Sequence, residues 1–188
     1  SGNTLIIFIS DNGGCHERIK NRGNYIRTTG ITGSPDSFDS YEYNWANASN
    51  TPFRWFKHWV HEGGISSPCI IWYPGMIEAG RLDNRPAHII DIMPTFIELA
   101  GGAYPDSLNG HTIKPMMGKS LVPLFENEKL GWERTLFWEH EGNRAIRKGD
   151  WKLVSRFDQT DGGFTPWELY DLSKDRTELN DLSSAFPD

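Results

Sequence analysis

Asp11 and Asn12 carry side-chain oxygens that can bind a hard cation, and the two residues directly follow an apolar segment over residues 4–10. The continuous run of β-branched and aromatic residues in this segment predicts a strand that is buried on both faces. In open α/β sheets, ligands gather at the carboxyl ends of such strands. A carboxylate and an amide oxygen suit Ca²⁺ or Mg²⁺. The alternative is a plain turn, because Asp, Asn and Gly are the commonest turn residues.

A second pattern lies between residues 47 and 75. The run Pro52-Phe53-Arg54 precedes Lys57, and Glu62-Gly63-Gly64-Ile65 begins five residues after that lysine. Another apolar segment follows over residues 69–73 and ends at Pro74-Gly75. Taken with the Asp-Asn-Gly strand end, this pattern resembles the type I sulfatases of the alkaline-phosphatase-like superfamily. The more detailed sequence around it looks like that of bacterial enzymes labelled arylsulfatases.

Further matches follow in the family's order. Residues 88–101 resemble its DIxPTxxxLAG helix, residues 118–124 its GxSLxPLL segment, and residues 145–153 and 168–172 its C-terminal hairpin and final strand. The resemblance implies an α/β fold, made of the C-terminal part of an alkaline-phosphatase-like parallel sheet plus a small antiparallel C-terminal sheet with a helix. It divides the chain into a portion of the sulfatase core at 1–130 and a small antiparallel subdomain at 131–188.

The resemblance also implies roles for single residues. Asp11 and Asn12 would supply part of the shell of a Ca²⁺ ion, with Mg²⁺ as the other candidate. Lys57 would place its ammonium on a sulfate oxygen near the leaving oxygen; without the motif it would be read as an exposed helix lysine.

Three neighbours of Lys57 are weaker candidates for contact with the substrate. Arg54 would position the lysine segment or contact the substrate. His58 and His61 flank the motif and are candidates for donating to the substrate or to the leaving group, His61 as a catalytic residue and His58 as a binding residue. Ordinary polar contacts are the alternative for both histidines.

The family's nucleophile has no match in this chain. That nucleophile is a Cys or Ser in a Cys/Ser-x-Pro/Ala-x-Arg motif, which is converted to formylglycine. Neither Cys15 nor Cys69 stands in such a motif, and no serine does. Because the family places this motif upstream of the Asp-Asn-Gly strand, we expect the chain to be the C-terminal fragment of a longer enzyme. Its partner would be the N-terminal part of the same protein, and the fragment alone would be inactive.

Composition and charge narrow the classes of partner that the chain can bind. The net charge of −6 argues against a nucleic-acid or anionic-membrane surface, although a local basic pocket can still bind an anionic substrate. Two cysteines far apart in the sequence are not a disulfide framework. No signal peptide or transmembrane stretch is visible, and only the resemblance suggests a periplasmic or extracellular location.

Periodicity and turn residues predict the elements that position these side chains. Strands are expected over 4–10, 69–73, 134–140, 143–148, 151–156 and 167–172, and helices over 53–61, 91–100 and 120–125. Residues 15–50 are expected to form a long loop. The hairpin that carries His140, Glu141, Asn143 and Arg144 is a candidate for reaching the substrate cleft. The first strand should lack parallel neighbours, so its open apolar surface favours self-association of the fragment.

These observations lead to one functional hypothesis and two alternatives. The chain is expected to be a fragment of a Ca²⁺-dependent sulfuric ester hydrolase that acts on aryl or, preferentially, carbohydrate sulfates. A phosphodiester or phosphonate ester hydrolase of the same superfamily is the first alternative, and the upstream nucleophile would discriminate the two. A non-catalytic binding module is the second.

Overall fold

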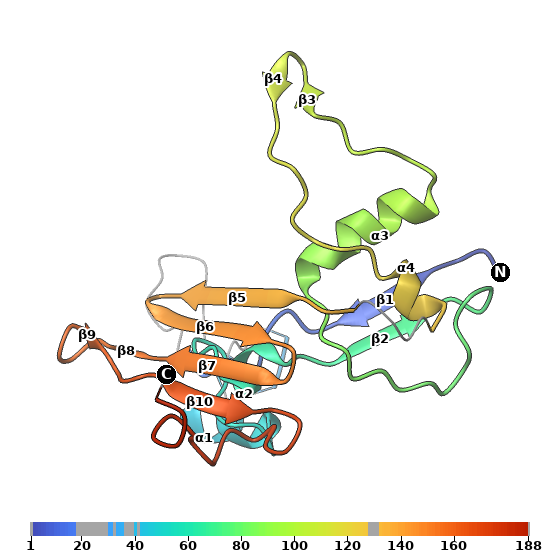
Figure 1. Ribbon diagram of the computed structural model, residues 1–188. Helices are drawn as coiled ribbons and strands as arrows, with labels where there is room; N and C mark the ends of the chain where they lie inside the picture. Colours follow the sequence, from blue (N-terminus) through green and yellow to red (C-terminus); the bar gives the residue numbers. More distant parts are fainter. Residues whose placement is uncertain are drawn as a thin grey trace. The chain divides into compact units, whose positions relative to one another are not determined.

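A computed structural model describes residues 2–17, 30–31, 33–35, 40, 42–127 and 132–187 of the chain (Figure 1). It consists of two compact units, one formed by Ser1–Phe8 and Cys69–Trp132 and the other by Ile9–Pro68 and Glu133–Asp188. The change of unit near residue 132 lies close to the expected boundary at residue 130. Residues 9–68, which the expected division assigns to the core portion, group with the C-terminal sheet.

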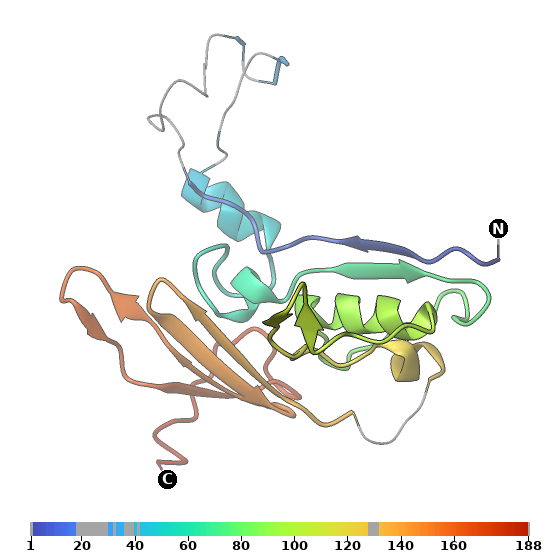
Figure 2. The same cartoon turned by 90° about the horizontal axis from the view of Figure 1, so that it is seen from above.

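The first unit contains a two-stranded sheet of β1 (Ile6–Ile9) and β2 (Cys69–Trp72), which confirms both strands with shorter bounds. The two strands run in opposite directions (Figure 2), and no other described strand pairs with β1. Their apolar side chains stay open to solvent, with Ile6 54%, Phe8 69% and Ile70 64% exposed. Within this chain, β1 is therefore not buried on both faces, and the expected open apolar surface is present.

Polar contacts between two helical segments organise the rest of this unit. The short 3₁₀ turn η2 (Ile89–Asp91) leads into α3 (Ile92–Leu99), and α4 (Val122–Phe125) follows later, which confirms both expected helices. Asp91 and Thr95 are fully buried. The Asp91 carboxylate accepts the His88 N–H at 2.7 Å and the Lys119 N–H at 2.9 Å, and Thr95 Oγ1 accepts the Leu121 N–H at 2.8 Å. These motif residues thus serve as a structural corner. The small hairpin of β3 (Ser107–Leu108) and β4 (His111–Thr112) was not expected.

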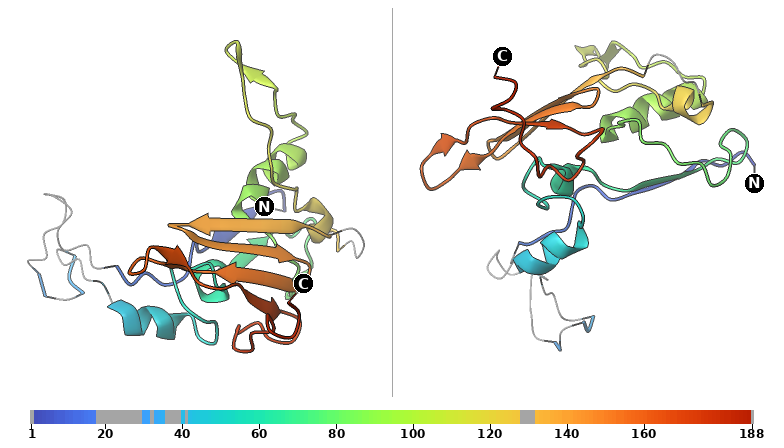
Figure 3. Two further views of the ribbon diagram at one scale, coloured as in Figure 1. Left: turned by 60° about the vertical axis from the view of Figure 1, so that its left-hand side comes forward. Right: turned by 60° about the horizontal axis from the view of Figure 1, so that its bottom comes forward.

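The second unit is built on a four-stranded antiparallel sheet in the order β10-β7-β6-β5 (Figure 3). Its strands are β5 (Thr135–His140), β6 (Asn143–Lys148), β7 (Trp151–Ser155) and β10 (Glu168–Asp171), which confirms the four expected strands. Gly149, with φ +61°, provides the expected turn between β6 and β7. A small extra hairpin pairs β8 (Phe157–Asp158) with β9 (Gly163–Phe164). The core of the unit is formed by Val60, Ala145, Val154, Tyr170 and Leu172.

The prediction of a helix over residues 53–61 is wrong. Trp55 and His58 have φ values of +67° and +101°, which a right-handed helix cannot accommodate. The aromatic residues spaced four apart stack in a compact turn, with the Trp55 and Trp59 rings 4.7 Å apart. The helix in this region is the short α2 (Glu62–Ile65), which begins after the aromatic turn.

The expected long loop over residues 15–50 is wrong at its end, where α1 (Glu42–Ser49) forms. Only Ala46 is buried in this helix, so the sequence shows no apolar periodicity that would reveal it. Residues 18–29, 32, 36–39 and 41 of that loop lie outside the described residues. Over the described part of the chain, every helix is too short or too polar to cross a bilayer.

Candidate functional site

The Asp-Asn-Gly-Gly turn after β1 is hydrogen-bonded to the segment that carries Lys57. The Gly13 N–H donates to the Gly64 carbonyl at 3.0 Å, and the Lys57 N–H donates to the Gly14 carbonyl at 3.0 Å. The Gly14 N–H donates to Asn50 Oδ1 at 3.0 Å. Two motifs that are about forty residues apart in the sequence are therefore joined through their backbones, as a shared site requires.

Three glycines make this close approach possible. A Cβ on Gly13 would lie 1.9 Å from the Gly63 carbonyl oxygen, and one on Gly64 would lie 1.9 Å from the Trp59 carbonyl oxygen. A Cβ on Gly63 would lie 2.1 Å from the Trp55 carbonyl oxygen. None of the three glycines has a positive φ. They are needed because backbone packs against backbone, and not for a conformation that other residues resist.

Asp11 and Asn12 have the donor chemistry of a hard-cation site. Asp11 is exposed, and among the described residues no hydrogen bond or ion pair engages its carboxylate. Asn12 Nδ2 donates to the Gly13 carbonyl at 2.8 Å, which leaves Oδ1 as an acceptor. Both residues thus offer oxygen ligands that fit Ca²⁺ or Mg²⁺, but they supply only part of a shell of about six to eight oxygens.

The Lys57 ammonium faces the residues that follow the Asp-Asn-Gly-Gly turn. Its Nζ lies 3.0 Å from Glu17 Oε2 and 3.8 Å from Cys15 Sγ. The hydrogen bond that Lys57 donates to Glu17 raises the pKa of Lys57, and the same bond lowers the pKa of Glu17. Lys57 is therefore a cation at neutral pH whose partner is a carboxylate that the sequence analysis did not identify.

Arg54 and His61 converge on one carboxylate of the C-terminal sheet. Arg54 Nη1 lies 2.9 Å from Glu168 Oε2, and His61 Nε2 lies 3.2 Å from the same oxygen. Tyr170 also donates to it, and Arg54 Nη1 additionally contacts the Tyr170 hydroxyl at 2.8 Å. Arg54 thus ties the lysine segment to β10.

Burial and hydrogen bonding have opposite effects on the pKa of Glu168 in this cluster. Burial by itself would raise the pKa of Glu168, but the hydrogen bonds from His61 and Tyr170 outweigh it and lower this pKa to about 2. His61 is fully buried, and burial lowers its pKa despite the nearby Glu168. The structure therefore holds a His61 ring with a lowered pKa away from solvent, beside a carboxylate that is charged at neutral pH.

A buried ion triad fixes the start of α2. Lys152 Nζ lies 2.9 Å from Glu62 Oε1 and 2.8 Å from Glu178 Oε1, and Glu178 Oε2 accepts the Glu62 N–H at 2.7 Å. Burial would raise the pKa of Glu62, but the Lys152 charge lowers it below its usual value. Such a buried network is costly to break, because removal of one partner leaves an uncompensated charge. Glu62 therefore holds the Gly-Gly turn in place.

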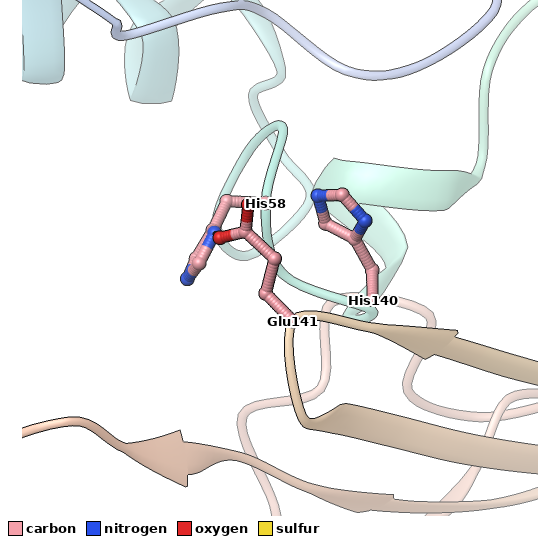
Figure 4. A group of neighbouring side chains, drawn as sticks. All are labelled: His58, His140 and Glu141. Carbon is pink, nitrogen blue, oxygen red and sulfur yellow. The ribbon is translucent and has the colours of Figure 1, made fainter.

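His58 lies apart from the Glu168 cluster and faces the turn between β5 and β6 (Figure 4). Its Nδ1 is 2.9 Å from Glu141 Oε2, and its ring centroid is 5.9 Å from that of His140. The prediction of a hairpin that reaches the substrate named both turn residues, together with Asn143 and Arg144. The structure brings His58 to them, while Arg54 and His61 lie at Glu168.

The family of the chain follows from a comparison with known proteins. Residues 52–186 match the family described as N-sulphoglucosamine sulphohydrolase, C-terminal. The chain belongs to the sulfatase family. It corresponds to the C-terminal part of a sulfatase, as the spaced motifs imply.

Relatives of this sulfatase chain are found in fungi and bacteria. It is 34% identical to an uncharacterized sulfatase of Schizosaccharomyces pombe over 99% of the chain, and it spans 35% of that protein. It is 30% identical to an N-acetylglucosamine-6-O-sulfatase of Bacteroides thetaiotaomicron over 68% of the chain, spanning 23% of that protein.

A solved structure shares the fold of the sulfatase chain. It shows a protein in complex with its substrate D-glucosamine-2-N,6-O-disulfate, and the TM-score is 0.60 at 24% identity, over 96% of this chain and 30% of that protein. The expected fold class is thereby confirmed, as the C-terminal part of an alkaline-phosphatase-like α/β fold with an antiparallel C-terminal sheet. The parallel pairing expected for the core portion is not found among the described residues, because β1 and β2 run in opposite directions (Figure 2).

The candidate site contains contacts that sequence reasoning did not find. Glu17, Glu168, Lys152 and Glu178 pair with residues that lie between 40 and 116 positions away, and no local spacing signals such pairs. A signal did exist for Glu17, because it follows the Asp11-Asn12-Gly13-Gly14 turn by only a few residues.

Proposed function

We propose that the whole protein hydrolyses sulfate esters, and that this chain contributes part of the cation site and the sulfate-binding lysine. The observation that carries the proposal is the hydrogen bond between the Lys57 N–H and the Gly14 carbonyl, at 3.0 Å. It joins the segment with the ammonium to the turn with the two oxygen ligands. An anionic ester and a hard cation can then be held by adjacent groups.

Lys57 is suited to the charge that develops in the reaction. A sulfate ester carries one negative charge, and more gathers on the bridging oxygen as the S–O bond breaks. An ammonium beside these oxygens stabilises that charge. Glu17 pairs with Lys57 in the structure, so the sulfate group would displace the carboxylate of Glu17 when the substrate binds.

Asp11 and Asn12 would hold part of the shell of a Ca²⁺ ion, with Mg²⁺ as the second candidate. The chemistry that such a dication supplies when bound is stabilisation of an attacking alkoxide and polarisation of the sulfuryl oxygens. Asn12 adds a ligand without adding a negative charge that would repel sulfate. The formylglycine nucleophile would come from the N-terminal part of the same protein, since no Cys or Ser of this chain stands in its motif.

We further propose a sulfated carbohydrate as the substrate class and a periplasmic or extracellular location. The relative named as an N-acetylglucosamine-6-O-sulfatase and the solved protein bound to a disulfated glucosamine support the substrate class.

The test is hydrolysis by the full-length protein, offered sulfated monosaccharides, an aryl sulfate and an aryl phosphodiester at equal concentration. We expect sulfate release from a sugar, and loss of that release in Lys57→Ala. Hydrolysis of the phosphodiester without release of sulfate would overturn the proposal in favour of the phosphodiesterase alternative.

A further inference from the structure

Three side chains with metal-binding atoms meet at the turn between β5 and β6. They are His58, His140 and Glu141, and their ligand atoms all lie within 4.8 Å of one another (Figure 4). His58 Nδ1 and Glu141 Oε2 are 2.9 Å apart. The His58 side chain is only 19% exposed, while His140 and Glu141 are exposed. A cation from solvent could therefore reach the group.

A fully buried asparagine holds the two histidines together. Asn143 Nδ2 donates to the His58 carbonyl at 3.3 Å and to the His140 carbonyl at 3.1 Å, and it lies 3.4 Å from His58 Nε2. Asn143 Oδ1 accepts the Phe157 N–H at 3.2 Å, which fixes the orientation of the amide. The amide thus joins two backbone segments that are far apart in the sequence, as a preformed ligand set requires.

Two of the three ligand residues occupy unfavourable backbone conformations. Glu141 and Gly142 have φ values of +50° and +84° between the paired residues His140 and Asn143. This two-residue turn favours Asn or Asp at its first position, and Glu is poorly suited to it. His58 has a φ of +101°. Residues held in such conformations cluster at functional sites, because the surrounding structure must compensate their strain.

The donor set selects the kind of ion. Two imidazole nitrogens and one carboxylate form a set that suits Zn²⁺ and related transition metals and leaves a coordination position open. The Asp11 and Asn12 pair offers only oxygens, which suit Ca²⁺ or Mg²⁺. The neighbouring Glu139 is not part of the set, because its carboxylate accepts the Gly142 N–H at 2.8 Å.

We propose that His58, His140 and Glu141 form a second metal site, which binds a divalent transition metal such as Zn²⁺. The ion would replace the direct contact between His58 Nδ1 and Glu141 Oε2. It would tie the residue next to Lys57 to the β5–β6 turn. This site is separate from the Ca²⁺ site of the proposed function and does not depend on it.

The test is calorimetric titration of the full-length protein with ZnCl₂, in the presence of saturating CaCl₂ to occupy oxygen-only sites. Wild type is compared with His140→Ala and with Glu141→Gln, which keeps the shape of an exposed side chain. Matched controls are Glu139→Gln in the same hairpin and His111→Ala in the β3–β4 hairpin. Substitution with Co²⁺ and its visible absorption spectrum report nitrogen coordination independently.

We expect one Zn²⁺ equivalent whose affinity falls at least tenfold in both cluster variants and is unchanged in both controls. Equal zinc titrations for wild type and the two cluster variants would overturn the proposal. A higher KM for a sulfated sugar in His140→Ala, with an unchanged zinc titration, would also overturn it and assign the group to substrate contact. If the protein hydrolyses no sulfate ester but the two cluster variants lose zinc affinity, the proposed function is wrong and the second metal site is still supported.

Discussion

Lys57 Nζ and Glu17 Oε2 lie 3.0 Å apart, so the cation proposed to bind sulfate already has an anionic partner from the chain. The pair raises the pKa of Lys57 and lowers that of Glu17 through their hydrogen bond. The lysine is therefore kept charged, but an entering sulfate group must compete with a carboxylate. Substitutions at Lys57 and at Glu17 can therefore measure two effects separately: the stabilisation that the ammonium gives to sulfate, and the competition from the carboxylate.

Lys57→Ala in the full-length enzyme should lower kcat by about two or more orders of magnitude, the scale seen when an electrostatic contact of the transition state is removed. Lys57→Arg should rescue poorly, because a planar guanidinium does not replace a point ammonium. Steady-state kinetics on a sulfated substrate provide the measurement. A change confined to KM would show that the lysine binds substrate and transition state equally.

Glu17→Gln should lower the KM for a sulfated substrate, because the competing carboxylate is removed while Lys57 stays charged. The effect should not exceed about fivefold, since exposed ion pairs contribute at most about 1 kcal/mol. Glu139→Gln, which also neutralises an exposed carboxylate, should leave KM unchanged. An increase in KM for Glu17→Gln would show that Glu17 orients Lys57 for the substrate.

Asp11→Ala in the full-length enzyme should abolish activity and weaken binding of Ca²⁺ or Mg²⁺, because a hard cation loses its anionic ligand from this turn. Asp106→Ala, at an exposed loop position of the first unit, is the matched control and should retain both properties. Metal content and turnover are measured on the same preparations. Wild-type values for both in Asp11→Ala would remove this residue from the metal site.

Stability should depend on Glu168 at low pH. Its pKa is lowered from 4.5 to about 2 in the folded protein. A lowered folded-state pKa means that the stabilisation is fully present above about pH 5 and is lost as the pH falls toward about 2. The shift corresponds to about 3 kcal/mol as an upper value, at about 1.4 kcal/mol per pH unit.

Urea unfolding of wild type and Glu168→Gln, followed by tryptophan fluorescence between pH 7 and pH 3, measures this dependence. The variant should be less stable at pH 7, and the difference from wild type should shrink as the pH falls. A difference that is constant across this range would show that Glu168 acts through packing and not through its charge.

Local patterns predicted the elements well where neighbouring residues decide the structure. The alternating strands around the Gly149 turn and the helix that begins near Asp91 are set by turn residues and periodicity, and both are confirmed. The spacing of Trp55 and Trp59 led to the wrong prediction of a helix over residues 53–61, because this spacing fits a helix as well as it fits the stacked turn that the structure shows.

Contacts between distant residues could not be predicted from one sequence. Lys152 pairs with Glu62 across 90 positions and Arg54 with Glu168 across 114, and neither spacing has a local signature. The family resemblance predicted that the Asp11 turn and Lys57 belong together, but it gave no reason for the glycines between them. That reason is the close approach of the Gly13 and Gly63 backbones.

The 188-residue chain by itself should not hydrolyse sulfate esters, whatever metal is supplied. Lys57 can stabilise charge and Asp11 can bind a cation, but no residue of this chain stands in the motif of the covalent nucleophile. The exposed Ile6, Phe8 and Ile70 of the β1–β2 sheet should also promote self-association. Turnover assays and analytical ultracentrifugation of the purified chain measure the two properties separately. Sulfate release that disappears in Lys57→Ala would contradict the fragment interpretation. A monomer at high concentration would contradict the self-association alone, because the catalytic argument rests on the nucleophile and not on the apolar surface.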